Sequence, residues 1–409
     1  MAGIREAIVT TMTSDDSARP GTPGEVFLAF LGLGLTSFGG PTAHLGYFRA
    51  AFVAKRNWIG DSAYSDLVAL CQFLPGPASS QVGIAIGLMR AGIFGAVAAF
   101  IGFTLPSVAL LVGFAWGLDT TGWLTPGMLS GLKIAALAVV AQAVIGMAPA
   151  LAPDRPRQAI ALCAAIGLLV FPGAVQQVAV IAASAAIGLA LPASARPPDA
   201  NGIAAPKLPG LPFLAAFLML LIGLPVLAGF AGDPRLDLVD SFYRAGSLVF
   251  GGGHVVLPLL DEAVVATGLV GADAFLAGYG AAQAVPGPLF SFAAYLGYVA
   301  DGRVGGVSGA ALALCAIYLP SFLLVFGVLP FWSRLSGNRQ ARAALNGANA
   351  GVLGILAAAL YTPVFTGAVA GPLHAALAAS AYAALTLGRL PPWLVVIACG
   401  LAGLVLWPN

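Results

Sequence analysis

Apolar stretches long enough to cross a membrane recur along this chain, and they constrain its fold more than any other feature. Residues 91–117 and 304–331 are two examples. The chain is 59% hydrophobic and only 8% charged, whereas soluble domains carry roughly 25% charged residues. So few charges cannot solvate the surface of a chain of 409 residues. The pattern therefore predicts an all-α polytopic membrane protein.

Composition also limits the expected partners and cofactors. The formal net charge is +2 without a basic cluster, so nucleic acid is not an expected partner. The apolar runs make the lipid bilayer an expected partner. Every cysteine lies inside an apolar run without CxxC spacing, which predicts small buried hydrophobic residues rather than metal ligands or disulfides. We expect no cofactor and no metal. The cysteines are Cys71, Cys163, Cys315 and Cys399.

Four short motifs occur twice in the same order with nearly constant spacing, which indicates a tandem duplication. SFGGPTAHL resembles VFGGGHVVL, and QFLPGP resembles QAVPGP. A Leu-Pro-Ser tripeptide and a longer helical stretch complete the series. The matched segments are 37–45 with 249–257, 72–77 with 283–288, 105–107 with 319–321, and 131–144 with 347–360.

Basic residues indicate that the two copies have opposite orientations in the membrane. Arg49, Lys55 and Arg56 follow the first motif in one copy, whereas Asp261 and Glu262 follow it in the other. The bias reverses after the Leu-Pro-Ser helix. Because Lys and Arg concentrate in cytoplasmic loops, this pattern is typical of inverted-topology repeats. It also predicts that the N-terminus is cytoplasmic.

These patterns divide the chain into five parts. Each repeat is expected to begin with two broken helical hairpins, near 24–48 and 63–89 in the first and near 238–260 and 275–300 in the second. The sequence leaves open whether the hairpins cross the membrane or re-enter. Four helices should follow in each repeat, near 91–117, 127–150, 158–171 and 174–191, and near 304–331, 343–361, 372–387 and 391–407. The parts are a cytoplasmic tail without signal-peptide features at 1–23, a first membrane repeat at 24–191, a cytoplasmic linker at 192–210, a topology-inverting helix at 211–230, and a second membrane repeat at 238–409.

The paired Pro-Gly-Pro motifs are the strongest candidates for a functional site. Proline removes a backbone donor, so each motif should interrupt a helix, and corresponding interruptions in inverted halves point to a transporter's substrate site. The helix N-terminus that follows each break offers N–H groups suited to an anion. Kinks that only shape the helices are the alternative. The candidate substrate-binding residues are Gln72, Pro75, Gly76, Pro77, Ser79, Ser80, Gln81, Gln283, Pro286, Gly287, Pro288 and Ser291, together with Gly39, Gly40, Gly251, Gly252, His254 and Lys133.

The glycines of the Phe-Gly-Gly stretches, Lys133 and His254 each have a second interpretation. The Phe-Gly-Gly stretches around Gly39 and Gly251 either let helices approach closely or add N–H groups to the cavity. Lys133 helps to neutralise an anion if it lies deep, and snorkels if it lies near a helix end. His254 is either a ligand donor or proton carrier, or a structural histidine. His44 has no aligned partner and is a weaker candidate.

The chain from about residue 24 to 407 resembles the long-chain members of the chromate ion transporter superfamily. The resemblance rests on FGGP, QFLPGPASSQ, FGGGH and QAVPGP. It implies efflux of chromate from the bacterial cytoplasm across the inner membrane, with sulfate as a structural analogue. The second half departs from the first, because Gly253 replaces Pro41 and residues 290–292 (FSF) replace 79–81 (SSQ). The two halves are therefore not expected to contact the ligand equally.

A tetrahedral dianion such as chromate carries only acceptor oxygens. A helix N-terminus contributes about 0.3–2 kcal/mol through its dipole, so we expect several N–H and hydroxyl donors, with a cation or retained water. The absence of a GxxxxGK[ST] loop from the sequence favours a secondary transporter. A sulfate or other oxyanion carrier, an anion channel and an intramembrane enzyme remain alternatives, although no HExxH motif supports the last. The sequence also leaves open whether the protein forms a homodimer.

Overall fold

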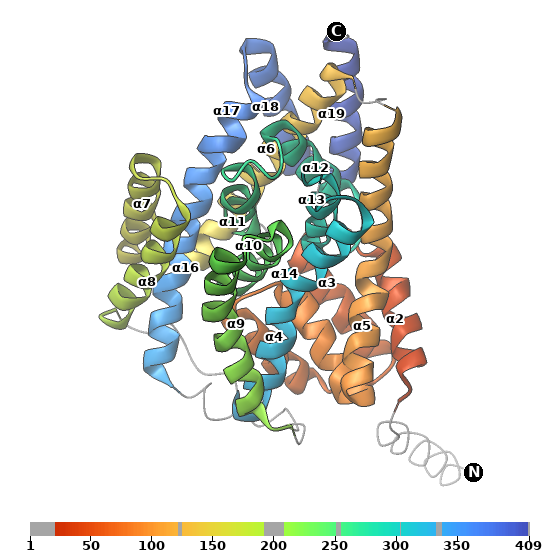
Figure 1. Ribbon diagram of the computed structural model, residues 1–409, viewed down its shortest axis with the longest axis vertical. Coiled ribbons are helices and arrows are strands. Elements are labelled where there is room, and N and C mark those ends of the chain that lie inside the picture. Colours follow the sequence, from red (N-terminus) through yellow and green to blue (C-terminus); the bar gives the residue numbers. More distant parts are fainter. Residues whose placement is uncertain are drawn as a thin grey trace, which may run out of the picture.

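The computed structural model describes residues 21–121, 125–191, 208–250, 255–302, 304–332 and 338–407. Within these ranges every regular element is a helix, which confirms the expected all-α class (Figure 1). The first half contains α2 (Pro23–Thr36), α3 (Gly40–Phe48), the π-helix η1 (Arg49–Lys55), α4 (Asp61–Phe73), α5 (Ala78–Thr121), α6 (Pro126–Leu151), α7 (Arg155–Val170) and α8 (Ala174–Leu189).

The second half repeats this order after one additional helix, α9 (Gly210–Ala231). Its hairpin region contains α10 (Pro234–Leu248), α11 (Val256–Leu260), the π-helix η3 (Asp261–Val265), α12 (Ala272–Ala284), the 3-10 turn η4 (Leu289–Ser291) and α13 (Phe292–Val299). The helices that follow are α14 (Gly306–Val328), η5 (Leu329–Phe331), α16 (Arg339–Ala359), η6 (Leu360–Phe365), α17 (Thr366–Ala368), α18 (Pro372–Thr386) and α19 (Pro392–Leu406).

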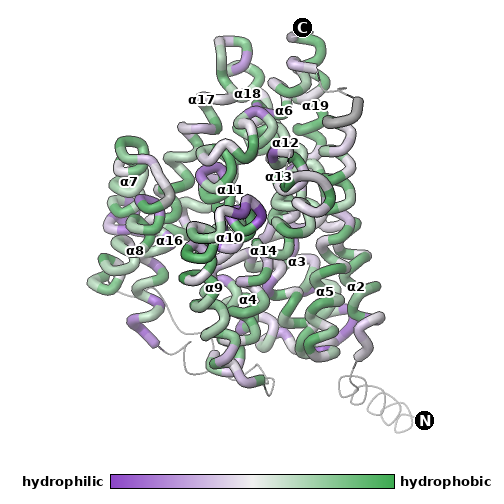
Figure 2. The backbone as a smooth tube through the Cα atoms, in the orientation of Figure 1, coloured by the Kyte–Doolittle hydropathy of each residue, from purple (hydrophilic) through white to green (hydrophobic). Residues whose placement is uncertain are grey.

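Among the described residues, five helical segments are long and apolar enough to cross a bilayer. They lie in α5, α6, α9, α14 and α16 with its extension to Ala368. Figure 2 shows apolar residues along most of the helices, with hydrophilic residues at ends such as the lower end of α16. In Figure 1 the two ends of the described chain lie at opposite ends of the molecule.

The helix α5 consists of two antiparallel arms rather than one continuous span. Ala91 (φ −142°) and Gly92 (φ +66°) leave the helical conformation, and the chain reverses there. A Cβ atom on Gly87 would lie 2.3 Å from the carbonyl oxygen of Gly95, so the arms meet where neither residue carries a side chain. The second half repeats this contact between α13 and α14, at Gly297 and Gly309.

Both broken hairpins of the first half start and end on the same side of the molecule. Trp58, between the hairpins, stacks on Phe52 of η1, and the guanidinium of Arg90 lies over the Trp58 ring at 5.2 Å. The N–H group of Gly21, just before α2, donates to the carbonyl of Arg90. The start of α2, the end of η1, the start of α4 and the end of the first α5 arm therefore share one side.

The second half builds its hairpins in the same way from the opposite side. The N–H group of Asp301, after α13, donates to the carbonyl of Leu269, before α12, at 3.1 Å. In Figure 1 the hairpin helices α2 and α4 lie in the lower part of the molecule, whereas α12 and α13 lie in the upper part. The helical interruptions meet between them, as described below.

Short helical pairs complete each half, close to the bounds expected from the sequence. The helices α7 and α8 contain 16 residues each, and α18 and α19 contain 15 each. These lengths correspond to about 24 and 22 Å, less than the roughly 30 Å hydrocarbon core. Each pair packs on the other half, α7 and α8 on α16, and α18 and α19 on α6. The two repeats are therefore interlocked.

The cysteine prediction is only half correct. All four cysteines are free thiols, and Cys71 and Cys399 are buried as expected, but Cys163 and Cys315 are exposed. Both exposed cysteines lie on apolar helices, α7 and α14. An apolar run in a membrane protein has a lipid-facing side as well as a packed side, so the run itself does not predict burial.

Candidate functional site

The first Pro-Gly-Pro turn connects α4 to α5 and docks on the second half of the chain. Gly76 adopts φ +121°, a conformation that residues with a side chain rarely adopt. Its N–H group donates to the carbonyl of Val249 at 2.7 Å. Val249 is the C-cap residue of α10, immediately before the second Phe-Gly-Gly stretch. A Cβ atom on Gly76 would lie 3.0 Å from Oγ of Ser321, on α14.

The second Pro-Gly-Pro turn repeats this arrangement with the halves exchanged. Gly287 adopts φ +101°, and its N–H group donates to the carbonyl of Ser37, where α2 ends, at 2.9 Å. A Cβ atom on Gly287 would lie 3.0 Å from Oγ of Ser107, on α5. Each turn therefore contacts both the interrupted hairpin and the Leu-Pro-Ser helix of the other repeat.

Four hydroxyl groups converge where the turns meet. Ser80 and Ser291 each lie just after one Pro-Gly-Pro turn, and together with Thr104 they face the hydroxyl of Tyr318. Thr104 and Tyr318 occupy matching positions, three residues before the serines of the two Leu-Pro-Ser motifs. The cluster is thus formed by two symmetry-related pairs, one member of each pair coming from each repeat.

Several buried polar atoms around the turns lack a hydrogen-bond partner of good geometry. Burying an unsatisfied polar group costs about 1–3 kcal/mol, and native structures contain few of them. A concentration of such atoms in one place, including hydroxyls that face one another, makes this cluster a candidate site for a polar ligand. The atoms are Oγ of Ser37, Ser80 and Ser321, Oγ1 of Thr104, Oε1 of Gln81, Nε2 of Gln283 and the hydroxyl of Tyr318.

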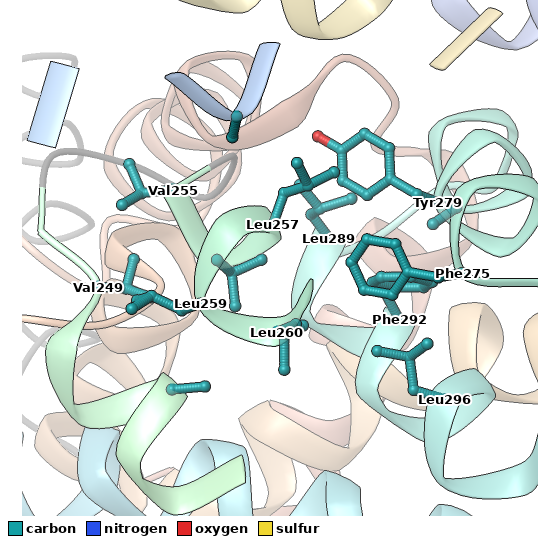
Figure 3. Close-up of a cluster of buried hydrophobic side chains, with 14 of the residues drawn as sticks. Val249, Val255, Leu257, Leu259, Leu260, Phe275, Tyr279, Leu289, Phe292 and Leu296 are labelled. Carbon is teal, nitrogen blue, oxygen red and sulfur yellow. The ribbon is translucent and has the colours of Figure 1, made fainter. Parts of the chain in front are cut away.

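The two sides of this cluster are not equivalent. Ser107 and Ser291 share a hydroxyl hydrogen bond of 2.6 Å, whereas the hydroxyls at the matching positions, Ser321 and Ser80, lack partners of good geometry. In the second half, Phe292 packs among apolar side chains such as Phe275, as Figure 3 shows. The first-half side therefore offers more free donors.

His44 reinforces the polar character of the first-half side. Its ring is buried, with 1% of its surface exposed. Nδ1 lies 3.4 Å from Oγ of Ser79, and Nε2 lies 3.2 Å from the carbonyl oxygen of Ser37. That carbonyl also accepts the N–H group of Gly287. His44 therefore connects the first turn to the contact that holds the second turn.

The remaining predicted residues are distributed unevenly around the turns. Gln81 donates from Nε2 to the carbonyl of Pro75 at 2.6 Å and closes its own turn. Gln72 is exposed at the end of α4, whereas Gln283 is half-buried. Gly39 and Gly40 adopt φ values of +102° and +77° at the first Phe-Gly-Gly interruption. Pro77, Pro286 and Pro288 are buried in the turns, and Gly251, Gly252 and His254 lie outside the described residues.

Lys133 is engaged away from the turns. Its ammonium group forms an ion pair with the carboxylate of Asp273, in the first turn of α12. The 13 residues of α12 span about 20 Å and separate this ion pair from the second Pro-Gly-Pro turn. The geometry favours the interpretation of Lys133 as a residue near a helix end.

We therefore expect Lys133→Gln to leave the apparent affinity for an oxyanion unchanged within about twofold. Asp273 is 67% exposed, and exposed ion pairs contribute roughly 0–1 kcal/mol. The measurement is a binding titration of the purified protein, with Asp273→Asn as the matched variant. A tenfold loss of affinity in Lys133→Gln alone would return Lys133 to the binding site.

Sequence reasoning missed Ser37, Thr104, Ser107, Tyr318 and Ser321. A signal for four of them was present. Ser107 and Ser321 belong to the duplicated Leu-Pro-Ser motif, and Thr104 and Tyr318 precede them by three residues, which places each pair on one helix face. Hydroxyl residues that recur on the same face of matched membrane helices point to a shared polar site.

A cavity of about 320 Å³ lies beside the second turn, between α5, α6, α12 and α19. It extends to Ala284 and Val285, directly before Pro286, and apolar side chains and one glycine line it. This cavity offers no side-chain donor to an anion. The polar cluster between the turns is therefore the better candidate site.

Comparison with known proteins connects the chain to one family. The chromate transporter family model matches residues 24–189 and 236–404. A chromate transport protein of Pseudomonas aeruginosa is 28% identical, with 99% of this chain and 97% of the relative covered. A probable chromate transport protein of Synechococcus elongatus is 26% identical, with 92% and 94% covered. An uncharacterised transporter of Methanocaldococcus jannaschii is 28% identical, with 76% and 77% covered. No solved structure matches.

Proposed function

The chain belongs to the chromate transporter family, and we propose on this basis that it exports chromate from the bacterial cytoplasm as a secondary transporter working by alternating access. The substrate binds between the two Pro-Gly-Pro turns. The observation that carries this proposal is the reciprocal docking of the turns, in which Gly76 and Gly287 each bond to the interrupted hairpin of the other half. Interruptions of this kind in inverted repeats mark the substrate sites of secondary transporters.

The donors around the turns suit a doubly charged oxyanion. A hydrogen bond to a charged group contributes about 1.5–3 kcal/mol, so the hydroxyls of Ser80, Thr104 and Tyr318 together exceed the contribution of a helix dipole. The free N–H groups at the start of α5 add to them. No carboxylate is among the residues of this cluster, and a carboxylate would repel the ligand.

The proposed direction follows from the charge of the substrate. Moving one charge through 100 mV changes its free energy by about 2.3 kcal/mol, so a dianion gains roughly 4.6 kcal/mol. With a negative cytoplasm, this energy supports a concentration ratio of about three decades toward the outside. Export of a dianion therefore needs no further energy source.

The proposed location is the bacterial inner membrane, with the N-terminal side in the cytoplasm. Arg49, Lys55, Arg56 and Arg90 lie on the side where α2 begins. In Figure 1 the start of α16, which carries Arg339 and Arg342, lies in the same lower part of the molecule. The concentration of basic residues on one side supports this orientation.

Chromate uptake into everted membrane vesicles tests substrate, direction and driving force together. Everted vesicles that contain the protein are expected to accumulate chromate against its gradient, and vesicles without it are not. Collapsing the voltage should reduce accumulation at least tenfold, because the electrical term carries most of the driving force. Equal uptake by both kinds of vesicle would contradict the proposal.

The same preparation separates the remaining alternatives. Excess sulfate that abolishes chromate uptake, with faster accumulation of labelled sulfate than of chromate, would assign the protein to sulfate transport. An anion channel would produce a steady current in reconstituted bilayers that does not saturate with chromate concentration, whereas a carrier saturates.

A further inference from the structure

We propose that His44 couples oxyanion binding to the uptake of one proton, by switching the Ser79 hydroxyl between accepting and donating a hydrogen bond. This inference rests on the proposed function, because it concerns the same binding site. It assigns a role to a buried histidine whose counterpart position in the second half, within 255–257, is apolar.

The contacts of His44 determine its neutral tautomer. The carbonyl of Ser37, 3.2 Å from Nε2, can only accept a hydrogen bond, so Nε2 must carry the hydrogen. In the neutral ring, Nδ1 is then an acceptor. The hydroxyl of Ser79, 3.4 Å away, must direct its hydrogen toward the ring. In this state Ser79 presents only lone pairs to its other neighbours, and lone pairs repel an anion.

Protonation of the ring reverses this arrangement. The imidazolium carries hydrogen on both nitrogens, so Nδ1 donates to Oγ of Ser79 and the Ser79 hydroxyl hydrogen becomes free to donate elsewhere. Ser79 lies in the first turn of α5, next to Ser80 in the proposed site. A dianion bound there gains one donor and one nearby positive charge, and it stabilises the imidazolium in return.

The other groups around His44 do not fix its protonation state, so its contacts with Ser37 and Ser79 and the bound anion determine it. Phe103 packs edge-on against the ring at 5.2 Å between centroids. The elements packed most closely on α3 are α5 and η1, and two of their described charged side chains are held by acidic partners. From α4, the Tyr64 hydroxyl donates to the carbonyl of Leu45, and Asp66 is buried on the same helix. The described charged side chains of α5 and η1 are Arg90, paired with Glu25, Arg49, paired with Asp61, and Lys55.

The same contacts connect the proton to the docking of the halves. The carbonyl of Ser37 accepts from both His44 and the Gly287 N–H group. A charged ring draws this carbonyl more strongly than a neutral ring does. Protonation therefore acts at once on a donor of the first turn and on the bond that holds the second turn.

Calorimetric titration with chromate near neutral pH, in buffers of different ionisation enthalpy, measures the protons taken up on binding. The wild-type protein is expected to take up about one proton per anion, with a Kd that rises about tenfold per pH unit once His44 is mainly neutral. His44→Gln should bind chromate more weakly and take up close to none. His374→Gln, which alters a histidine stacked on Trp407, is the matched control and should behave as the wild type.

Ser79→Ala provides an independent variant in case His44→Gln fails to fold. It removes the switched hydroxyl while keeping the histidine. The change of Kd per pH unit should therefore be at least threefold smaller than in the wild type. Chromate binding by the wild type without proton uptake would overturn the role of His44, as would unchanged uptake in both variants. A wild-type protein that does not bind chromate at all would instead overturn the proposed function.

Discussion

Replacing Gly76 with leucine is expected to abolish chromate transport while leaving the protein inserted in the membrane. Gly76 adopts φ +121°, which costs a residue with a side chain about 1–3 kcal/mol. Its new Cβ atom would also lie 2.5 Å from Nε2 of Gln81 and 3.0 Å from Oγ of Ser321. The first turn must then move away from Val249 and from the hydroxyl cluster. Chromate uptake into everted vesicles should fall to the level of vesicles without the protein.

A matched substitution separates this local effect from a general loss of folding. Gly113, on the lipid-facing side of α5, has nothing within 4 Å of an added Cβ atom, so Gly113→Leu should transport normally. Gly287→Leu should behave as Gly76→Leu does, because the second turn docks in the same way. Normal export by Gly76→Leu, at wild-type protein levels, would remove the turns from the mechanism.

The double variant Tyr318→Phe with Ser80→Ala is expected to weaken chromate binding by about 100-fold or more. Each substitution removes one hydroxyl that faces the proposed ligand, and a hydrogen bond to a charged group contributes about 1.5–3 kcal/mol. Each single variant should therefore lose roughly tenfold or more in affinity. Binding titrations of the purified variants measure these losses, and the full double-mutant cycle shows whether the two hydroxyls act on the same ligand.

Two exposed positions supply the control for this pair. Ser308→Ala and Tyr361→Phe remove the same groups from exposed residues of α14 and η6 and should not change the affinity. The stability of the double variant should not fall much, because it removes both of two hydroxyls that face each other and so leaves neither opposite a missing partner. A variant that loses stability but keeps its affinity would show that these hydroxyls serve the fold.

The interruptions and the duplication could be predicted because they depend on local chemistry. Proline at positions 75, 77, 286 and 288 prevents a continuous helix whatever surrounds it. The inverted orientation follows from the basic residues of the loops. Whether the hairpins cross the membrane or return within it could not be predicted, because a run such as 63–89 has the same composition in both cases.

The partners of the turns could not be predicted either. Val249 and Ser37 contribute backbone carbonyls to Gly76 and Gly287, and any residue type could do so. Lys133 looked like a suitable cation for an anion site, but Asp273 lies 140 residues away in sequence, and no local pattern connects the two. Only the packing of α6 against α12 brings them together.

The unequal serine pairs carry a further consequence for how the molecule changes shape. Ser107 and Ser291 are bonded at 2.6 Å, while Ser80 and Ser321 lack partners of good geometry. In a chain built from two inverted copies, exchanging the conformations of the copies produces a second structure with the same contacts in the opposite places. Ser80 would then meet Ser321, and Ser107 would separate from Ser291. Under the proposed alternating access, the two states of the transport cycle would therefore differ in which serine pair is closed.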